Sequence, residues 1–343
     1  MKIKDLFAAV ADISREKNID YEVLLEAIGQ GLLAAYKKTW GDSGNIRIEI
    51  NEKEKMIHVF ALKKVVDTVE DPHNEVTLRK AKKLNKDVEL GSEIDIEITP
   101  ESFGRFAAST CKQIVMQRLK EAEKKKIIDE FEGKEKQMVF GEVSRMGGKG
   151  VYFKLGNAEG LLPKSEQIPG EVYGPGRKFH CYVLRMDRTS REPLVILSRT
   201  HPGLLQRLME HEIPEIEQGV IEIIGIVREP GLRAKVAVNS LQERVDPVGS
   251  CIGTKGVRIN VVSDELKGER IDVVRWFEDP RLFIASSLSP AKVYSVQIIP
   301  EDKRAIVYVE PDQFSLAIGK KGSNVRLASR LTGFRVDMMQ LEE

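Results

Sequence analysis

The chain has 343 residues, of which 41% are hydrophobic and 31% charged, and its formal net charge is +1. This length predicts about two to four globular domains, at roughly 100–200 residues each with small modules at the low end. No apolar run approaches the ~18 residues that cross a bilayer, and residues 1–5 lack a hydrophobic signal core, so we expect a cytoplasmic protein without a membrane partner. The three cysteines, Cys111, Cys181 and Cys251, are isolated in the sequence, which argues against disulfides and zinc sites.

Residues 1–40 are predicted to form two helices, with Asp20 as the N-cap of the second. The apolar residues of the first helix share one face: Leu6, Phe7, Val10 and Ile13. Beyond them, strands are predicted at 46–50, 56–66 and 94–98, and a short charged helix at 77–84. Thr99 and Pro100 favour a further helix start, with Thr99 as the cap, and that helix is predicted to run to about Phe131. Residues 1–131 therefore predict an α+β domain ending in a long connector helix.

Residues 133–200 have a different pattern, in which short runs of alternating apolar and polar residues are separated by glycine and proline. These runs cover residues 137–143, 151–155, 178–184 and 193–197. Short strands at this spacing predict a five-stranded OB-type barrel. Barrels of this class bind single-stranded nucleic acid by stacking bases on exposed aromatic side chains. Tyr152 and Phe153 are adjacent in one strand and point to opposite faces, so one can be core, and Tyr152 is a candidate RNA contact.

Residues 203–277 and 280–343 repeat one pattern of helix, strand, strand, helix, Gly-x-x-Gly, helix and strand. The glycines lie at 253 and 256 in the first copy and at 319 and 322 in the second, an offset of 66. The offset is 65 further on, where Gly268 corresponds to Gly333. A register held over some twenty residues indicates an internal duplication. The element order matches the bacterial-type KH arrangement, in which Gly-x-x-Gly clamps the backbone of a single-stranded RNA.

Gly-x-x-Gly alone is a weak pattern, because residues 41–44 and 147–150 also fit it. Context separates the two KH loops, since each has a helix before it and a helix beginning at its second glycine. Glycine allows close backbone approach, and the helix N-terminus offers free N–H groups to a phosphate. The alternative, that the KH folds serve only as protein scaffolds, stays open. The candidate RNA-binding residues are Gly253, Thr254, Lys255, Gly256, Arg258, Gly319, Lys320, Lys321, Gly322, Asn324, Arg326 and Tyr152.

A net charge of +1 means that RNA binding must rest on local basic patches. Residues 313–336 contain five basic residues and no acid, whereas the first copy mixes both signs. The second loop is therefore predicted to be the stronger electrostatic anchor. We expect no catalytic residue, metal or cofactor, because the five histidines have no metal-ligand spacing and the chain lacks a Walker loop and a nucleophile elbow.

Several stretches in combination resemble the NusA family of bacterial transcription elongation, termination and antitermination factors. They are residues 103–108, 212–216, 246–253, 265–276, 316–319 and 324–328. The resemblance implies a multidomain α+β protein that binds the core of RNA polymerase near the RNA exit channel through residues 1–131. It also implies that the barrel and KH domains receive the nascent single-stranded RNA. Such factors modulate pausing, termination and antitermination, and join other Nus factors in antitermination complexes.

One position departs from the family pattern, because Ser323 stands where members often have glutamine before the asparagine of the second clamp helix. A side-chain RNA contact at Ser323 is therefore not carried over. A different class of function remains possible on the residues alone, namely a free RNA chaperone or ribosome-assembly factor with the same RNA-binding modules. Residues 1–131 discriminate between the two, since a chaperone has no need of a polymerase-binding domain. In either case we expect a monomer.

Overall fold

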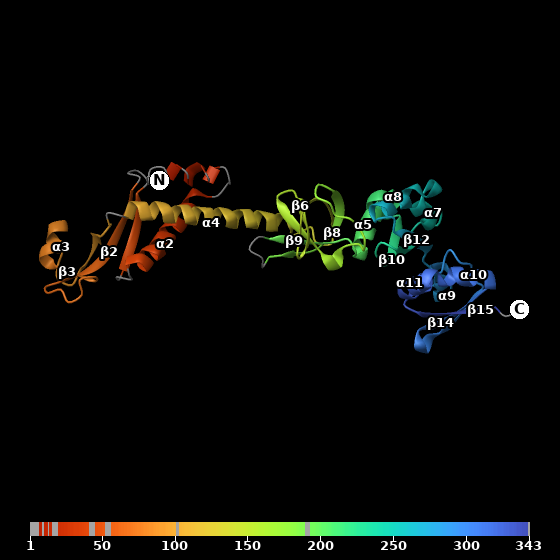
Figure 1. Cartoon of the computed structure of the whole chain (residues 1–343). Helices are drawn as coiled ribbons and strands as arrows, with labels where there is room; N and C mark the ends of the chain where they lie inside the picture. The colour runs from red at the N-terminus through yellow and green to blue at the C-terminus, as the bar shows by residue number, and fades with distance from the viewer. Residues whose placement is uncertain are drawn as a thin grey trace. The chain divides into compact units, whose positions relative to one another are not determined.

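The computed structural model describes residues 7–8, 10–12, 14–15, 20–40, 45–51, 56–100, 103–188 and 193–341. The chain divides into two compact units, Met1–Lys126 and Ile127–Glu343, each with hydrophobic cores of its own (Figure 1). In the first predicted helix, the described residues are helical, and Phe7 and Val10 are buried. Leu6 and Ile13 lie outside the described residues, as does the Gly-x-x-Gly match at 41–44.

In the first unit, helix α2 (Tyr21–Trp40) packs against a mixed sheet. Asp20 caps the helix as predicted, because its carboxylate accepts a hydrogen bond from the N–H of Glu22 at 2.9 Å. Strand β2 is central, pairing antiparallel with β1 and β4 and parallel with β3. The short β3 was not anticipated, since three residues carry too little alternation to signal a strand. The remaining elements of this unit are β1 (Asn45–Asn51), β2 (Met56–Val66), β3 (Glu75–Thr77), α3 (Leu78–Leu84) and β4 (Glu93–Glu97).

The predicted long helix is α4 (Phe103–Phe131). Phe103, Ala107 and Cys111 are buried in the core that α4 shares with α2. The Thr99 hydroxyl accepts from the N–H of Val59 and donates to Glu97, whereas residues 101 and 102, on which its expected role as the cap of this helix depends, lie outside the described residues. Thr99 therefore ties the end of β4 to β2. None of the helices within the described ranges is both long and apolar enough to cross a membrane.

The second unit begins with a closed five-stranded barrel in the order β5-β6-β7-β9-β8, which confirms the OB-type prediction. Phe153 and Leu197 fill its interior together with Phe131 from the last turn of α4. Strand β7, which had not been placed from the sequence, completes the closure by pairing with β6 and with β9. The elements are β5 (Met138–Gly147), β6 (Gly150–Leu155), β7 (Ala158–Pro163), η1 (Lys164–Glu166), β8 (Lys178–Asp187) and β9 (Leu194–Ser198).

The two KH copies follow, and their sheets have the same topology. In each, the first strand pairs antiparallel with the second, and the second pairs parallel with the third. The first copy contains α5 (Pro202–Glu212), α6 (Pro214–Glu217), β10 (Ile221–Glu229), β11 (Arg233–Ser240), α7 (Pro247–Ile252), η2 (Thr254–Gly256), α8 (Val257–Glu265) and β12 (Arg270–Arg275). The second contains α9 (Pro280–Ser287), β13 (Ser295–Ile299), η3 (Pro300–Asp302), β14 (Arg304–Val309), α10 (Pro311–Ile318), η4 (Lys320–Gly322), α11 (Ser323–Thr332) and β15 (Arg335–Gln340). The predicted order is confirmed, with the short α6 as an addition.

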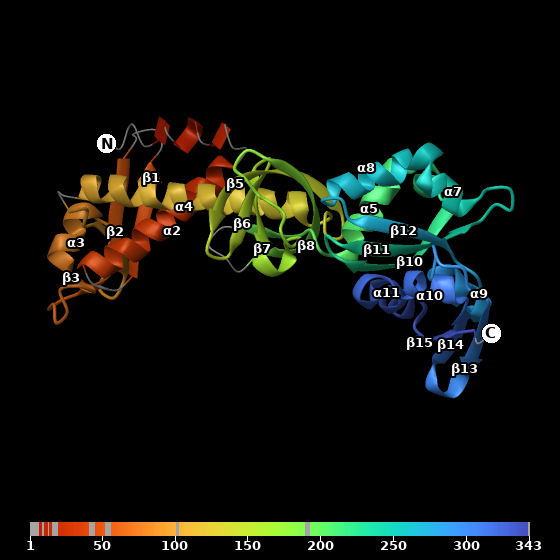
Figure 2. The same cartoon turned by 45° about the vertical axis from the view of Figure 1, so that its right-hand side comes forward.

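The two KH copies pack directly on each other. Helix α11 of the second lies against β10 and β11 of the first, as Figure 2 shows. Gly225 makes this approach possible, because a Cβ at residue 225 would lie 3.3 Å from the side chain of Leu331. Lys235 is fully buried and donates to the carbonyl oxygen of Ser289 in the second copy at 2.9 Å. The sheet of the first copy is thus covered by the helix that follows the second Gly-x-x-Gly loop.

Candidate nucleic-acid interface

The two Gly-x-x-Gly loops have the same backbone conformation. We name residues 253–256 the first clamp loop and residues 319–322 the second clamp loop. The opening glycine has φ 73° in both, with ψ 171° and 172°. The third residue of each is a lysine in the left-handed region, Lys255 at φ 54° and Lys321 at φ 53°. The duplication seen in the sequence is therefore preserved residue by residue in the backbone.

The two glycines of a clamp loop are required for different reasons. At Gly319 a Cβ would lie 2.8 Å from Asn324 Cβ and 2.9 Å from the Asn324 backbone nitrogen, so the loop folds tightly over the next helix. Its φ and ψ also fall in a region that is essentially restricted to glycine. At Gly322 nothing lies within 4 Å of such a Cβ, and only the positive φ of 72° favours glycine.

Each clamp loop presents donors and positive charge. The second glycine adopts the left-handed conformation and is followed at once by α8 or α11, and neither helix has a side-chain N-cap among the described residues. The N–H groups of a helix N-terminus that lacks such a cap attract anions such as phosphate. Lys255, Lys320 and Lys321 are exposed, and no ion pair involves them within the part of the chain that the structure describes. A hollow of about 380 Å³ adjoins the first clamp loop, with Gly253 and Thr254 in its wall.

Arg258 and Asn324, both predicted to contact RNA, occupy equivalent positions 66 residues apart and each hydrogen-bonds to backbone of its own domain, although Arg258 also lines the hollow beside the first clamp loop. The Arg258 guanidinium donates to the carbonyl oxygen of Ser250 at 2.8 Å and forms an ion pair with Glu215 at 2.9 Å. Asn324 is fully buried and donates to the carbonyl oxygens of Ala317 at 3.0 Å and Leu288 at 2.9 Å. Each side chain satisfies carbonyl groups at the end of the helix before the loop, so it supports the loop from within.

Residues 313–336 contain no acidic residue, but Arg326 in this stretch contacts an acidic residue from another part of the chain. The Arg326 Nε donates to a carboxylate oxygen of Glu229 in the first KH copy at 2.6 Å. Within the second clamp loop itself, the electrostatic advantage that the sequence predicts therefore rests on the exposed Lys320 and Lys321. A sequence window does not reveal this pairing, because 97 residues separate the two partners.

In the barrel, Phe153 is buried and Tyr152 is half-buried on the outer face, as their alternation predicts. The guanidinium of Arg145 lies over the Tyr152 ring at 3.5 Å from its centroid, and is itself paired with Glu159 at 3.0 Å. One face of the ring is thus already occupied by a cation–π contact. Phe140 is more exposed than Tyr152 and was not predicted as a candidate, although the alternation in β5 was a signal that could have found it.

Comparison with known families matches three segments of the chain. Residues 5–125 match the NusA N-terminal domain, residues 199–276 the NusA-like first KH domain, and residues 280–343 the NusA-like second KH domain. The transcription termination/antitermination protein NusA of Halalkalibacterium halodurans is 43% identical to the chain, over 98% of this chain and 88% of that protein. The chain belongs to the NusA family.

Two further similarities concern other NusA proteins. The transcription termination/antitermination protein NusA of Thermus thermophilus is 41% identical, over 99% of this chain and 90% of its own length. The solution structure of the N-terminal domain of NusA from Bacillus subtilis is 39% identical and covers 35% of this chain and 98% of that chain, with a TM-score of 0.32. Family membership and two KH domains make the chain an RNA-binding transcription regulator, so the resemblance noted in the sequence is confirmed.

Proposed function

We propose that this NusA-family chain binds the core of RNA polymerase through residues 1–131 and holds the nascent single-stranded RNA on the barrel and the two KH domains. The barrel is taken as residues 133–200 and the KH domains as 203–277 and 280–343. The RNA part of the proposal rests on the repeated clamp backbone, which carries exposed lysines at its tip. In this role the chain modulates pausing, termination and antitermination of transcription.

The proposed contacts divide into two kinds. The residues of the clamp loops meet the RNA backbone directly, and Tyr152 stacks a base on the ring face that Arg145 leaves free. Asn324 acts on binding only through the shape of its loop, because its side chain is buried and engaged internally. Arg258 supports its loop in the same way but also lines the hollow beside the first clamp loop, where it can meet the RNA. The direct clamp contacts are Gly253, Thr254, Lys255, Gly256, Gly319, Lys320, Lys321 and Gly322.

The polymerase part of the proposal is supported by the first unit, which has its own core and matches the NusA N-terminal domain. We further propose that the chain acts in the cytoplasm as a monomer, needs no cofactor, and joins other Nus factors in antitermination complexes. Immobilised full-length chain and residues 1–131 should each retain core RNA polymerase, whereas residues 133–343 should not. RNA binding by the full-length chain without any retention of polymerase would instead favour a free RNA chaperone.

The clamp assignment is tested by Lys320→Asp combined with Lys321→Asp, measured by fluorescence anisotropy with an unstructured RNA. Each phosphate that a single strand places against a lysine or arginine adds about 0.7 to the salt dependence, d log K/d log [salt], so removing both lysines should reduce the slope by about 1.4. Lys292→Asp combined with Lys303→Asp is the matched control, because both lysines are exposed and lie in the same KH domain away from the clamp loop. Equal affinity and slope in the two double variants would refute the assignment.

A further inference from the structure

Strand β10 of the first KH domain ends in Arg228 and Glu229, and these adjacent residues contact different neighbours. Arg228 is buried and forms a bidentate ion pair with Glu269, at 2.8 Å and 2.7 Å. Its Nη1 also donates to the carbonyl oxygens of His201, at 3.0 Å, and Arg199, at 3.3 Å, in the segment that follows the barrel. Arg228 therefore anchors the end of β10 to the barrel side of the domain.

Arg199 continues this connection into the barrel. It is fully buried and makes a bidentate ion pair with Glu171, with both hydrogen bonds at 2.7 Å. It also donates to the carbonyl oxygen of Glu265, at the end of α8, at 2.6 Å. Bidentate arginine–carboxylate pairs fix orientation as well as distance. These hydrogen bonds thus fix the positions of the barrel, of α8 in the first KH domain and of β10 relative to one another.

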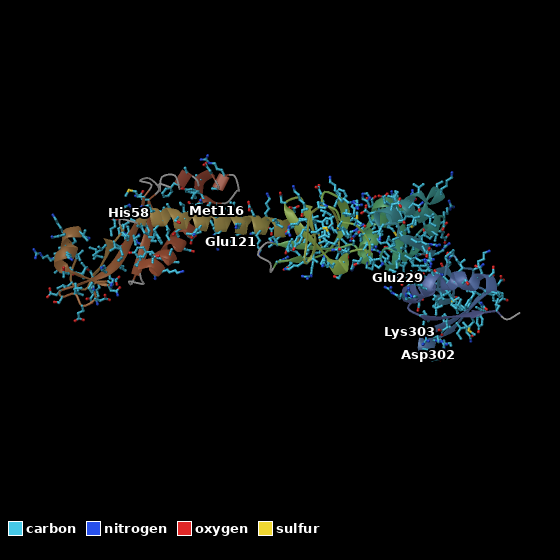
Figure 3. The ribbon with its side chains drawn as sticks, viewed as in Figure 1. His58, Met116, Glu121, Glu229, Asp302 and Lys303 are labelled. Carbon is cyan, nitrogen blue, oxygen red and sulfur yellow. The ribbon has the colours of Figure 1, made fainter. Side chains whose placement is uncertain are left out.

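Glu229 extends the same path to the second KH domain. Its carboxylate accepts from Arg326 Nε at 2.6 Å, and Arg326 Nη1 donates to the carbonyl oxygen of Lys321 in the second clamp loop at 3.3 Å. The neighbouring Arg330 donates to the carbonyl oxygen of Arg228 at 3.4 Å. Figure 3 labels Glu229 where the first KH domain meets the second. Hydrogen bonds therefore connect the β10 end of the first KH domain to the loop that carries the exposed lysines.

We propose that Glu229 is a positioning residue for the second clamp loop, acting through Arg326 to set that loop at a fixed offset from the first. The proposal rests on RNA binding by both clamps, as proposed above. Each clamp holds only about four nucleotides, so the affinity of a longer strand depends on how well the second clamp is placed for it. The pair itself contributes little to folding, because Arg326 is half exposed and solvent screens its charge. Its effect is therefore on geometry rather than on stability.

A simpler role for Glu229 predicts the opposite effect of its replacement on RNA affinity. If the carboxylate only masked the charge of Arg326, replacing it would free a cation beside the clamp and strengthen RNA binding at every length. Positioning instead predicts that replacing Glu229 lowers the affinity only for RNA that is long enough to occupy both clamps. The length dependence of the effect therefore separates the two roles.

The test uses the full-length chain with Glu229→Gln and two unstructured RNAs of mixed sequence, one of about four nucleotides for a single clamp and one of about 20 nucleotides for both. Glu222→Gln is the control, because Glu222 is exposed in the same strand and has no ion pair or side-chain hydrogen bond among the described residues. In the wild type the longer RNA should bind more tightly. Glu229→Gln should reduce that length advantage by roughly threefold to tenfold, part of the 10²–10⁴ that linkage supplies. Affinity for the short RNA and the thermal midpoint should not change.

Arg326→Gln completes a double-mutant cycle with Glu229→Gln. Positioning predicts that the double variant loses no more of the length advantage than either single variant, because the two residues act as one unit. A length advantage that is unchanged in Glu229→Gln, or tighter binding of both RNAs, would overturn the positioning role while leaving RNA binding intact. No length advantage in the wild type would overturn two-clamp binding, and the positioning role with it.

Discussion

The clamp loops predict a specific difference between two glycine-to-alanine substitutions three residues apart. Gly319 and Gly322 both have positive φ, at 73° and 72°, so backbone propensity alone would treat them alike. Their surroundings differ, because a Cβ at 319 would lie 2.8 Å from Asn324 Cβ and 2.9 Å from its backbone nitrogen, whereas a Cβ at 322 would meet nothing within 4 Å. Neither obstructing atom can move without displacing the first turn of α11.

The magnitudes follow from these two contributions. Alanine at 319 incurs about 1–3 kcal/mol of backbone strain and about 1–3 kcal/mol of overpacking, so Gly319→Ala should destabilise the loop by about 2–6 kcal/mol. Alanine at 322 incurs only the left-handed conformation, about 1–2 kcal/mol. The first clamp loop should show a weaker version of this contrast. There a Cβ at 253 would lie 2.9 Å from Cγ and 3.2 Å from Cβ of Arg258, and it would meet no backbone atom as close as the one at 319.

Hydrogen exchange measured by mass spectrometry reports the local opening free energy of residues 311–332 in each variant. Gly319→Ala should lower protection of this segment far more than Gly322→Ala, with Gly253→Ala and Gly256→Ala as the parallel pair in the first KH domain. Equal loss of protection in Gly319→Ala and Gly322→Ala would show that the close approach to Asn324 does not govern the loop.

Three further predictions concern buried groups. Arg199→Met should lower the free energy of unfolding by about 3–5 kcal/mol, because it leaves Glu171 buried without its partner. Arg199→Lys should not restore this stability, since lysine cannot form the bidentate pair. A urea titration that shows a loss below 1 kcal/mol for Arg199→Met would contradict this prediction. Burial lowers the pKa of Lys235 from 10.5 to about 8 despite the nearby Asp272, so above pH 8 the unfolded state binds a proton that the folded state does not. Relative to Lys235→Met, the wild type should therefore gain about 2 kcal/mol between pH 7 and pH 9.5, whereas a difference independent of pH would exclude the lowered pKa. Burial raises the pKa of Cys111, Cys181 and Cys251 to about 12, so none should react with Ellman's reagent at pH 8 until the chain is denatured, and rapid reaction of the native protein would disprove their burial.

The sequence by itself determined the features that depend on neighbouring residues. Strand alternation located β1, β2 and β4, and Asp20 marked the start of α2, because strand pleating and helix capping both act within a few residues. The duplicated Gly-x-x-Gly pattern identified both clamp loops, since glycine is strongly favoured at the positive φ that both glycines of each loop adopt. Lys320 and Lys321 are exposed in the second of these loops, as the electrostatic role predicted for it requires.

The tertiary structure alone decided what the remaining polar side chains do. Asn324 looked like an RNA contact because it follows the clamp, yet it is buried and donates to carbonyl groups at two helix ends, and Arg258 pairs with Ser250 and Glu215. Arg326 lay in an acid-free stretch, yet it pairs with Glu229 of the other KH domain. Thr99, expected as a helix cap, also accepts a hydrogen bond from β2, which its neighbours in the sequence do not indicate. Hydrogen-bond partners far apart in the chain leave no periodic signal, so only the packed fold shows which polar groups remain free for RNA.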